Sequence, residues 1–204
     1  MKLIIVLLFS YLLGSIPNGY IFGKQFAEKD IRNYGSGNVG ATNVARVAGY
    51  KVGLLVAFLD ITKGFLSVYI AKTFLLPEYE MAFVFTAAIL AIIGHNWSMF
   101  LSFQGGKGVA TSVGVILSLF PLSFIVLFIV WVTMIILTKM VSIGSILGAI
   151  SLPISILFIY SSESSYIIFG IIIALLVIFS HRSNIKRIIK GNENKMTWPP
   201  GKGR

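Results

Sequence analysis

The sequence predicts an all-α polytopic membrane protein with seven transmembrane helices. Of its 204 residues, 56% are hydrophobic and only 12% are charged, whereas a soluble domain carries about 25% charged residues. The mean hydropathy is +0.89. One transmembrane helix needs about 20 apolar residues, so the chain has room for six or seven spans and none for a separate soluble domain. We therefore expect residues 1–204 to form a single integral membrane domain.

Seven apolar runs follow one another along the chain. The first contains Gly14 and Pro17 and continues without a small-residue cleavage pattern, so we expect a retained helix rather than a signal peptide. The fourth is the shortest and ends before Pro121, which favours a tilted helix or a thinned bilayer. Asn192–Arg204 is expected to be a flexible polar tail. The predicted spans are 3–22, 52–76, 81–101, 109–120, 122–137, 143–160 and 165–180.

Positive charge is concentrated on one set of connections. Every Lys and Arg except Lys2, Lys63 and Lys72 falls in these connections. Cytoplasmic loops carry the excess of Lys and Arg, so the N-terminus is predicted outside and the C-terminus cytoplasmic. The opposite side has two tight acidic connections, Pro77–Glu80 and Ser161–Ser164. The basic connections are the loops 24–51, 102–108 and 138–142 and the tail 181–204.

The charge balance and the missing residue types narrow the chemistry. A net charge of +10 suits anionic lipid headgroups or phosphorylated metabolites, and no nucleic-acid partner is expected because the basic residues are spread over several loops. The sequence has no cysteine, which excludes disulfides, a thiol nucleophile and thiolate metal sites. Only His95 and His181 offer imidazole, so no metal site is expected.

A glycine-rich run in the first basic loop has the composition of an anion site. It reads Gly-Ser-Gly-Asn-Val-Gly-Ala-Thr-Asn from Gly35 to Asn43. It matches the dinucleotide pattern G-x-G-x-x-G, but no strand precedes it and no βαβ unit fits between membrane spans. Closely spaced glycines let backbone N–H groups converge on an anion, so an anion site is favoured over a flexible loop. Its candidate residues are Ser36, Gly37, Asn38, Gly40, Thr42, Asn43 and Arg46.

A second glycine-rich turn precedes the fourth span. Gly105, Gly106, Lys107 and Gly108 lead into an apolar run, and a helix N-terminus directs free N–H groups at a ligand. It is not a P-loop, because Leu101 and Gly108 stand where that motif needs glycine and Ser or Thr. We expect these residues to bind phosphate, although a lysine in a tight cytoplasmic turn also satisfies the positive-inside rule.

The third cluster follows the last span. His181 and Asn184 are three residues apart, so they share one face if the helix continues. A basic helix end after a span is most often an interfacial anchor, the role assigned to Arg187 and Lys190. For His181 and Asn184, a binding site and an anchor are equally consistent with the pattern.

Five further polar residues lie inside or beside spans. Asp60 and Lys63 form an i,i+3 pair in the second span, where they are either functional or an internal ion pair that fixes helix packing. Ser142 and Ser145 begin the sixth span, where their hydroxyls could donate to a phosphate. His95 ends the third span and is expected to orient the adjacent loop.

Together these runs resemble the three signature motifs of the bacterial membrane acyl-phosphate:glycerol-3-phosphate acyltransferases. The resemblance covers nearly the whole chain. Ser98 and Gln104 depart from the family pattern, which more often has proline and a basic residue there. The matching stretches are Gly35–Asn43 with Arg46, Asp60–Gly64, Gly94–Asn96 with Gly105–Thr111, Ser142–Ser145, and His181–Arg187 with Gly191 and Glu193.

The resemblance implies a reaction at the cytoplasmic face of the bacterial inner membrane. A long-chain acyl phosphate would acylate the 1-hydroxyl of sn-glycerol 3-phosphate, giving lysophosphatidic acid and phosphate, the first acylation of phospholipid biosynthesis. Acyl phosphate carries a good leaving group, so no cofactor, metal or covalent nucleophile is required. The implied partners are acyl phosphate, glycerol 3-phosphate, membrane lipid and a soluble enzyme that forms the acyl phosphate.

The resemblance also implies residue roles. In one version, His181 is the base that accepts the hydroxyl proton. In the other, which we favour, the donor's own phosphate accepts that proton and His181 only binds and orients the substrate. Asp60, Lys63 and His95 would support the site, and the other glycine-loop residues would shape it. The predicted catalytic residues are His181, Lys107, Asn184 and Ser142. The predicted phosphate ligands are Ser36, Arg46, Lys107 and Asn184, with Ser142 and Ser145 completing the pocket.

A small transporter of a phosphorylated or anionic metabolite is the main alternative, because seven spans and a basic pocket also describe one. A transporter needs polar groups near the midplane, whereas the clusters here are predicted at one surface. A non-catalytic lipid-binding protein would not need two glycine-rich anion loops.

Overall fold

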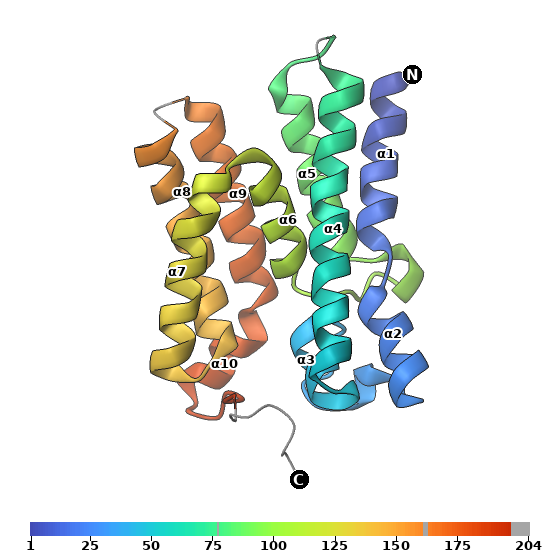
Figure 1. Ribbon diagram of the computed structural model, residues 1–204, viewed down its shortest axis with the longest axis vertical. Coiled ribbons are helices and arrows are strands. Elements are labelled where there is room, and N and C mark those ends of the chain that lie inside the picture. The colour runs from blue at the N-terminus through green and yellow to red at the C-terminus, as the bar shows by residue number, and fades with distance from the viewer. Residues whose placement is uncertain (77, 161–162, 197–204) are drawn as a thin grey trace. The chain divides into compact units, whose positions relative to one another are not determined.

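The computed structural model describes residues 1–76, 78–160 and 163–196, and every regular element in these ranges is a helix (Figure 1). The chain divides into two compact units. Unit 1 is Met1–Ser118, and unit 2 begins at Leu119. An all-helical protein was predicted, and the described residues confirm it.

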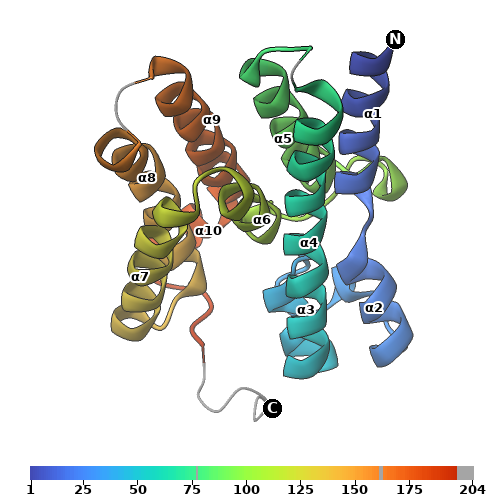
Figure 2. The same ribbon diagram turned by 45° about the horizontal axis from the view of Figure 1, so that its top comes forward.

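Unit 1 is built around three helices that lie side by side. Its elements are α1 (Lys2–Ser15), α2 (Asn18–Ala27), η1 (Ile31–Asn33), α3 (Ala41–Ala48), α4 (Tyr50–Leu75), α5 (Met81–Asn96), η2 (Met99–Leu101) and α6 (Val109–Leu119). Helices α1, α4 and α5 pack on one another (Figure 2). A Cβ at Gly14 of α1 would lie 2.1 Å from the Ala91 oxygen of α5, and one at Gly94 of α5 would lie 2.3 Å from the Tyr11 oxygen of α1. Only glycine permits so close an approach between these helices.

The first predicted span is interrupted. Helix α1 ends at Ser15 and α2 begins at Asn18, and Ile16 between them has a ψ of 117°. Pro17 explains the break, because proline lacks the N–H that continues a helix and disfavours the helical conformation in the residue before it. The predicted span 3–22 is confirmed as an apolar segment long enough to cross a membrane, since Lys2–Ala27 qualifies as one, but its helix is broken at Ile16 and Pro17 rather than continuous.

The predicted polar loop 24–51 also contains helical structure. Helix α2 runs on to Ala27, and α3 fills 41–48. Helix α3 forms because its apolar side is covered: Val44 is fully buried in a cluster with Ile31, Val39, Val56 and Leu101. This cluster fastens the glycine-rich run to α4 and to the segment after α5.

Unit 2 consists of α7 (Pro121–Thr138), α8 (Val141–Ile159), α9 (Ser164–Ser180) and α10 (Arg182–Ile189). Helix α8 packs against both α7 and α9 (Figure 1). One end is closed by Phe120, whose ring contacts the rings of Tyr160, Tyr166 and Phe169. Helix α10 turns away from α9 by 60°.

The number of membrane crossings is only partly determined. All seven predicted apolar runs are helical, but among the described residues five segments are long and apolar enough to cross a bilayer, or six if the bent pair α9 and α10 is one span. Helix α6 has 11 residues, about 17 Å at 1.5 Å per residue, against a hydrocarbon core of about 30 Å. Seven complete crossings therefore stay a prediction. Pro77, Ser161, Ser162 and 197–204, on which two predicted turns and most of the predicted tail fall, lie outside the described residues.

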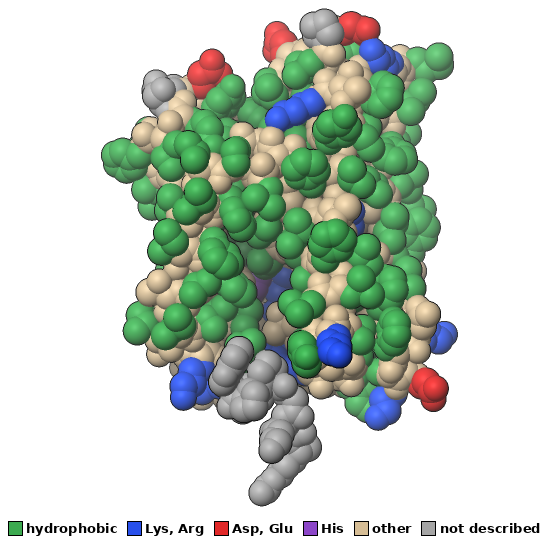
Figure 3. All heavy atoms as spheres, in the orientation of Figure 1, with side chains coloured by type: hydrophobic (Ala, Val, Ile, Leu, Met, Phe, Trp, Pro, Cys, Tyr) green, Lys and Arg blue, Asp and Glu red, His purple; other side chains and the backbone are tan. Residues whose placement is uncertain are grey.

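The exposed surface of the helices is apolar. Phe58, Ile136 and Phe158 are 65%, 71% and 81% exposed, and apolar side chains cover the middle of the helices in Figure 3, with most charged groups toward the helix ends. In unit 1, Lys2 Nζ lies 2.8 Å from Glu78 Oε1, so the start of α1 and the α4–α5 turn share one end, as predicted. This surface fits an integral membrane protein.

Candidate active site

Asn43 closes the first glycine-rich run into a loop. Its Oδ1 accepts a hydrogen bond of 2.7 Å from the N–H of Ser36, and its Nδ2 donates bonds of 3.1 Å to the oxygens of Ile31 and Tyr34. Because the buried amide of Asn43 is committed to the loop itself, this side chain shapes the anion site rather than donating to an anion.

The other polar groups of this loop lie within or just after the segment that the hydrogen bond between Ser36 and Asn43 closes. Ser36 is half-buried, whereas Thr42 and Arg46, four residues apart on α3, have exposed side chains. Asn38 Oδ1 accepts a 2.8 Å bond from the N–H of Gly40, which orders the start of α3. Hydroxyl, guanidinium and backbone donors therefore lie on one short segment, as an anion site requires.

A second arginine in this region does not belong to the candidate site. Arg32 Nη2 lies 2.6 Å from Asp30 Oδ2, and the guanidinium holds the pKa of the Asp30 carboxyl below its ordinary value. The guanidinium also lies over the Tyr20 ring, 4.9 Å from its centroid. The charge of Arg32 is therefore compensated locally.

The second glycine turn caps the end of α5. The N–H of Gly105 donates to the Asn96 oxygen over 3.0 Å, and the N–H of Gly106 donates to the His95 oxygen over 2.9 Å. These two predicted phosphate donors thus satisfy carbonyls at a helix end. Half-buried Lys107 follows them, and Gly108, with φ +75°, accepts the bond from Ser112 that opens α6. Lys107 and the first turn of α6 therefore follow directly on the residues that cap α5.

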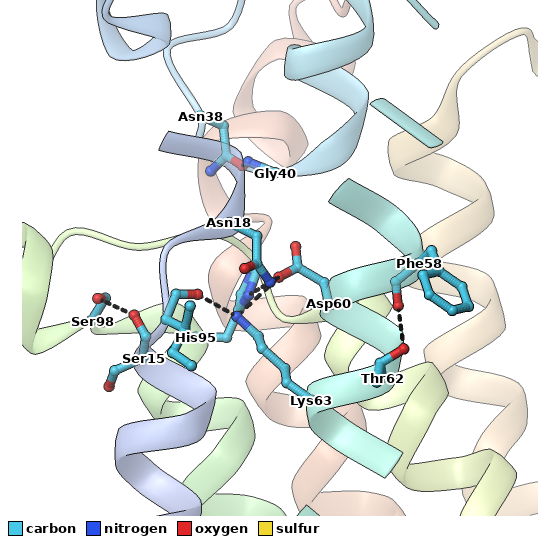
Figure 4. Close-up of polar contacts among 11 residues, drawn as sticks. Ser15, Asn18, Asn38, Gly40, Phe58, Asp60, Thr62, Lys63, His95 and Ser98 are labelled. Carbon is cyan, nitrogen blue, oxygen red and sulfur yellow. Dashed lines mark hydrogen bonds and ion pairs between the residues drawn. The ribbon is translucent and has the colours of Figure 1, made fainter. Parts of the chain in front are cut away.

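Asp60, Lys63 and His95 meet in one buried network beneath these loops (Figure 4). Lys63 Nζ lies 2.9 Å from Asp60 Oδ1, and His95 Nδ1 lies 3.7 Å from the same oxygen. Asn18 Nδ2 donates to Asp60 Oδ1 over 3.0 Å. Of the two interpretations of the Asp60–Lys63 pair, the internal ion pair is present, and it joins α4 to α2 and α5.

The break after α1 leaves backbone carbonyls that need partners inside an apolar environment. Lys63 Nζ donates to the Ile16 oxygen over 2.9 Å, and Ser98 Oγ donates to the Ser15 oxygen over 2.6 Å. Ser98, one of the two departures from the family pattern, therefore has a structural use here. Ser98 also lines the small cavity that Gly105 borders, and Gly64, next to Lys63, packs on the Thr111 oxygen of α6.

In unit 2, His181 and Asn184 occupy the junction of α9 and α10. Both side chains are buried, whereas Arg182 between them is exposed. The shared helix face was predicted for a continuing helix, but the chain bends by 60° at His181, so the two side chains share burial rather than one helix face. His181 Nδ1 lies 2.8 Å from the Val177 oxygen. A carbonyl can only accept, so Nδ1 carries the hydrogen and the neutral ring has its lone pair on Nε2.

Glu193 binds the Asn184 side chain. Asn184 Nδ2 donates to Glu193 Oε1 over 2.6 Å, and Arg187 Nε donates to Oε2 over 2.8 Å. Burial of Glu193 favours a higher carboxyl pKa, but the bonds from Asn184 and Arg187 and the nearby Ser142 hydroxyl outweigh it, and the pKa lies below its ordinary value. The Oγ of Ser142 is buried and has no hydrogen-bond partner among the described residues.

One prediction about unit 2 needs correction. The tail from Asn192 is not free at its start, because Glu193 is buried and the N–H of Met196 donates to the Lys139 oxygen. Ser145 Oγ donates to the Val141 oxygen over 2.9 Å, within α8, and its contact with a phosphate stays a prediction. Arg187 is a partner of Glu193 as well as part of a basic helix end.

The sequence reasoning did not assign functions to Asn18 and Glu193. Glu193 is the single acidic residue after Glu163, and an isolated carboxylate in a basic tail is a signal for an internal partner. No comparable signal marks Asn18, whose contact is with a residue 42 positions away. Among the described residues, no three His, Asp or Glu side chains are grouped to hold a metal ion.

Comparison with known proteins agrees with this geometry. Residues 4–191 match the family model described as Glycerol-3-phosphate acyltransferase. The glycerol-3-phosphate acyltransferase of Thermoanaerobacter sp. (strain X514) is 45% identical, with 96% of each chain covered. That of Staphylococcus haemolyticus (strain JCSC1435) is 43% identical, covering 97% of this chain and all of the relative.

Solved structures give the same result. The glycerol 3-phosphate form of PlsY (YgiH), an integral membrane glycerol 3-phosphate acyltransferase, is 36% identical with a TM-score of 0.86, covering 97% of this chain and 96% of that one. Its lysophosphatidic acid form is 34% identical with a TM-score of 0.87, covering 98% of both chains. The chain therefore belongs to the glycerol-3-phosphate acyltransferase family of integral membrane enzymes.

Proposed function

We propose that this enzyme transfers a long-chain acyl group from an acyl phosphate to the 1-hydroxyl of sn-glycerol 3-phosphate. The products are 1-acylglycerol 3-phosphate (lysophosphatidic acid) and inorganic phosphate. The observation that supports this most strongly is the pair of PlsY structures, one in a glycerol 3-phosphate form and one in a lysophosphatidic acid form. These two molecules differ by one acyl ester, which is the bond that the proposed reaction makes.

An acyl phosphate suits this chain as the donor. Both substrates would then carry phosphate, which matches a net charge of +10 and two glycine-rich segments that each bear a basic side chain, Arg46 and Lys107. A mixed anhydride is already activated, so the absence of cysteine from the sequence is no obstacle to direct transfer. The exposed apolar helix surface lies in lipid, where a long acyl chain also lies.

The proposed step is a direct displacement at the acyl carbon. The 1-hydroxyl oxygen bonds to the carbonyl carbon, the bond from that carbon to the bridging oxygen breaks, and inorganic phosphate leaves with the electron pair. The hydroxyl proton passes to the phosphate of the donor, with His181 Nε2 as the alternative acceptor. The protein contributes positioning and charge stabilisation.

Residue roles follow from the chemistry within each unit. In unit 1, Ser36, Thr42 and Arg46 and the segment Lys107–Gly108 supply donors and positive charge to phosphate, and Gly37, Asn38, Gly40, Asn43, Gly105 and Gly106 shape those loops. In unit 2, Asn184 and His181 contact a substrate, and Ser142 completes that pocket beside Glu193. Ser145 contributes through packing and its lone pairs.

We also propose a topology of seven spans, with the N-terminus outside, the C-terminus in the cytoplasm and the reaction at the cytoplasmic face of the bacterial inner membrane. The distribution of Lys and Arg supports it. A soluble enzyme must then supply the acyl phosphate from the same side. The transporter alternative lapses, because the chain belongs to an enzyme family.

A donor comparison tests this function. Purified enzyme in lipid is given glycerol 3-phosphate with palmitoyl phosphate, palmitoyl-CoA or palmitoyl acyl carrier protein in parallel. Lysophosphatidic acid should form from palmitoyl phosphate alone. Product from the thioester donors and none from palmitoyl phosphate would overturn the proposed donor while leaving the family assignment intact.

A further inference from the structure

The buried Asp60–Lys63 pair joins four separate parts of unit 1. Asp60 Oδ1 is 2.9 Å from Lys63 Nζ and accepts a 3.0 Å bond from Asn18 of α2. Lys63 also binds the Ile16 oxygen at the break after α1, and His95 at the end of α5 lies 3.7 Å from Asp60. Figure 4 shows these side chains converging from different elements.

The space at this network is too small for substrate. The cavity that it borders has a volume of about 10 Å³, about the size of one water molecule. Its lining includes Val39 from the first glycine-rich run and Gly105 from the second, together with Asp60 and His95. The network therefore touches the supports of both anion loops without space to bind glycerol 3-phosphate itself.

Contacts on the Lys107 side transmit the position of the network directly. The His95 oxygen accepts the N–H of Gly106, and a Cβ on Gly106 would lie 2.1 Å from His95 Nε2. On α4, a Cβ on Gly64, the neighbour of Lys63, would lie 2.1 Å from the Thr111 oxygen of α6. Before Lys107, the backbone of Gly106 therefore packs on the His95 ring, and after it, the backbone of Thr111 packs on Gly64 of α4. A shift of His95 or of α4 must move the turn between them.

A second set of contacts leads to the first loop. Gly19, the neighbour of Asn18, packs so closely on the Val39 oxygen that a Cβ there would lie 1.7 Å from it. Val39 lies between Asn38 and Gly40, which are hydrogen-bonded to each other. Asn18 therefore couples Asp60 to the loop that carries Ser36 and Arg46.

We propose that Asp60 and Lys63 are positioning residues, which set the separation of the two phosphate-binding loops of unit 1 without touching substrate. Burying two charges in a membrane span costs free energy, and an apolar pair of similar volume would pack α4 without that cost. A fixed geometry that serves both loops is a reason to keep the charges. The inference rests on the proposed phosphate-binding role of Arg46 and Lys107.

The test separates positioning from stability. The double variant Asp60→Asn/Lys63→Met removes both charges while keeping side-chain size, so no lone charge remains buried. Ser67→Ala, also buried on α4 and with no hydrogen-bond partner for its Oγ, is the matched control. Thermal unfolding in detergent, kcat and both KM values are measured, together with the Kd of glycerol 3-phosphate by titration calorimetry without donor.

The double variant should remain folded, and KM for glycerol 3-phosphate or for the acyl donor should rise about tenfold or more, because small misplacements of binding groups carry penalties of this size or larger. Ser67→Ala should match the parent enzyme. Kinetic constants and Kd within twofold of the parent, in a folded double variant, would overturn the proposal. Failure of the proposed function is separate, because it appears as no transfer from acyl phosphate in the unaltered enzyme.

A second pair of variants covers the case in which the double variant does not fold. Gly106→Ala drives a methyl group into the His95 ring, so it should raise KM or Kd. If the turn is positioned through His95, the combination with His95→Ala should lose less than the sum of the two single losses, because the methyl group occupies vacated space. Strictly additive losses would overturn the proposal.

Discussion

Asn184 donates a 2.6 Å hydrogen bond from its Nδ2 to Oε1 of Glu193. The bond fixes which way the amide faces, because a carboxylate can only accept from the NH₂ group. Arg187 holds the other oxygen of the same carboxylate over 2.8 Å. Asn184, a predicted substrate ligand, is thus held by a residue from the start of the tail.

Glu193→Gln tests this orientation. Glutamine keeps the shape but weakens the bond to Asn184 and loses the charge that pairs with Arg187, so kcat/KM should fall about tenfold. Steady-state kinetics with palmitoyl phosphate and glycerol 3-phosphate measure it. Glu163→Gln, at the exposed start of α9, is the matched control. A Glu193→Gln enzyme with unchanged kinetics would show that the amide of Asn184 needs no such partner.

Glu193 should also make stability depend on pH. Its folded-state pKa lies below the ordinary value of 4.5, so its contribution is complete above that value and is lost as pH falls through the lower folded-state pKa. The thermal midpoint of the parent enzyme should therefore drop below about pH 4.5. The difference in thermal midpoint between the parent enzyme and Glu193→Gln should become smaller over the same pH range. A gap that stays constant from pH 7 to acid would contradict a carboxylate that is ionised in the fold.

Lys107 and Arg46 are expected to carry the phosphate charge in unit 1. Lys107→Ala and Arg46→Ala should each lower kcat/KM about 10²-fold or more while leaving the thermal midpoint close to that of the parent. Lys190→Ala removes an exposed lysine at the end of α10 and controls for net charge. Near-normal turnover in both Lys107→Ala and Arg46→Ala would remove these residues from the site.

Asn43 should matter for the stability of the first loop. Asn43→Ala removes three hydrogen bonds, each with a net contribution of about 1 kcal/mol, so the free energy of unfolding should fall by about 2–3 kcal/mol. Asn38→Ala, which removes one bond to Gly40, should have a smaller effect. Thermal unfolding in detergent compares the two variants. Equal losses of unfolding free energy would show that the hydrogen bonds of Asn43 do not stabilise the loop more than the single bond of Asn38 does.

The sequence predicts the helices well because their apolar runs are long. Each predicted span contains a helix, and the basic connections contain the polar clusters. Pro17 was noted in the sequence, but the helix break there was not predicted, because membrane helices tolerate proline where neighbouring groups satisfy the freed backbone. Here Lys63 and Ser98 supply that stabilisation from distant segments.

The site is harder to predict because its groups are assigned by contacts between distant residues. The glycines at 105 and 106 looked like phosphate donors, yet their N–H groups cap α5. Asn43 looked like a ligand, yet its amide holds its own loop. Helix α3 is eight residues long, too short for its apolar side to stand out within a polar loop. Residue types were therefore predictable, and the direction in which each donor points was not.

One labelling measurement tests the proposed reaction most directly. sn-Glycerol 3-phosphate carrying ¹⁸O in its 1-hydroxyl is incubated with palmitoyl phosphate and the purified enzyme, and both products are analysed by mass spectrometry. Direct acyl transfer predicts lysophosphatidic acid with the label in its ester oxygen and an equal amount of unlabelled inorganic phosphate. Label in the released phosphate, or phosphate release without lysophosphatidic acid, would contradict acyl transfer to the 1-hydroxyl.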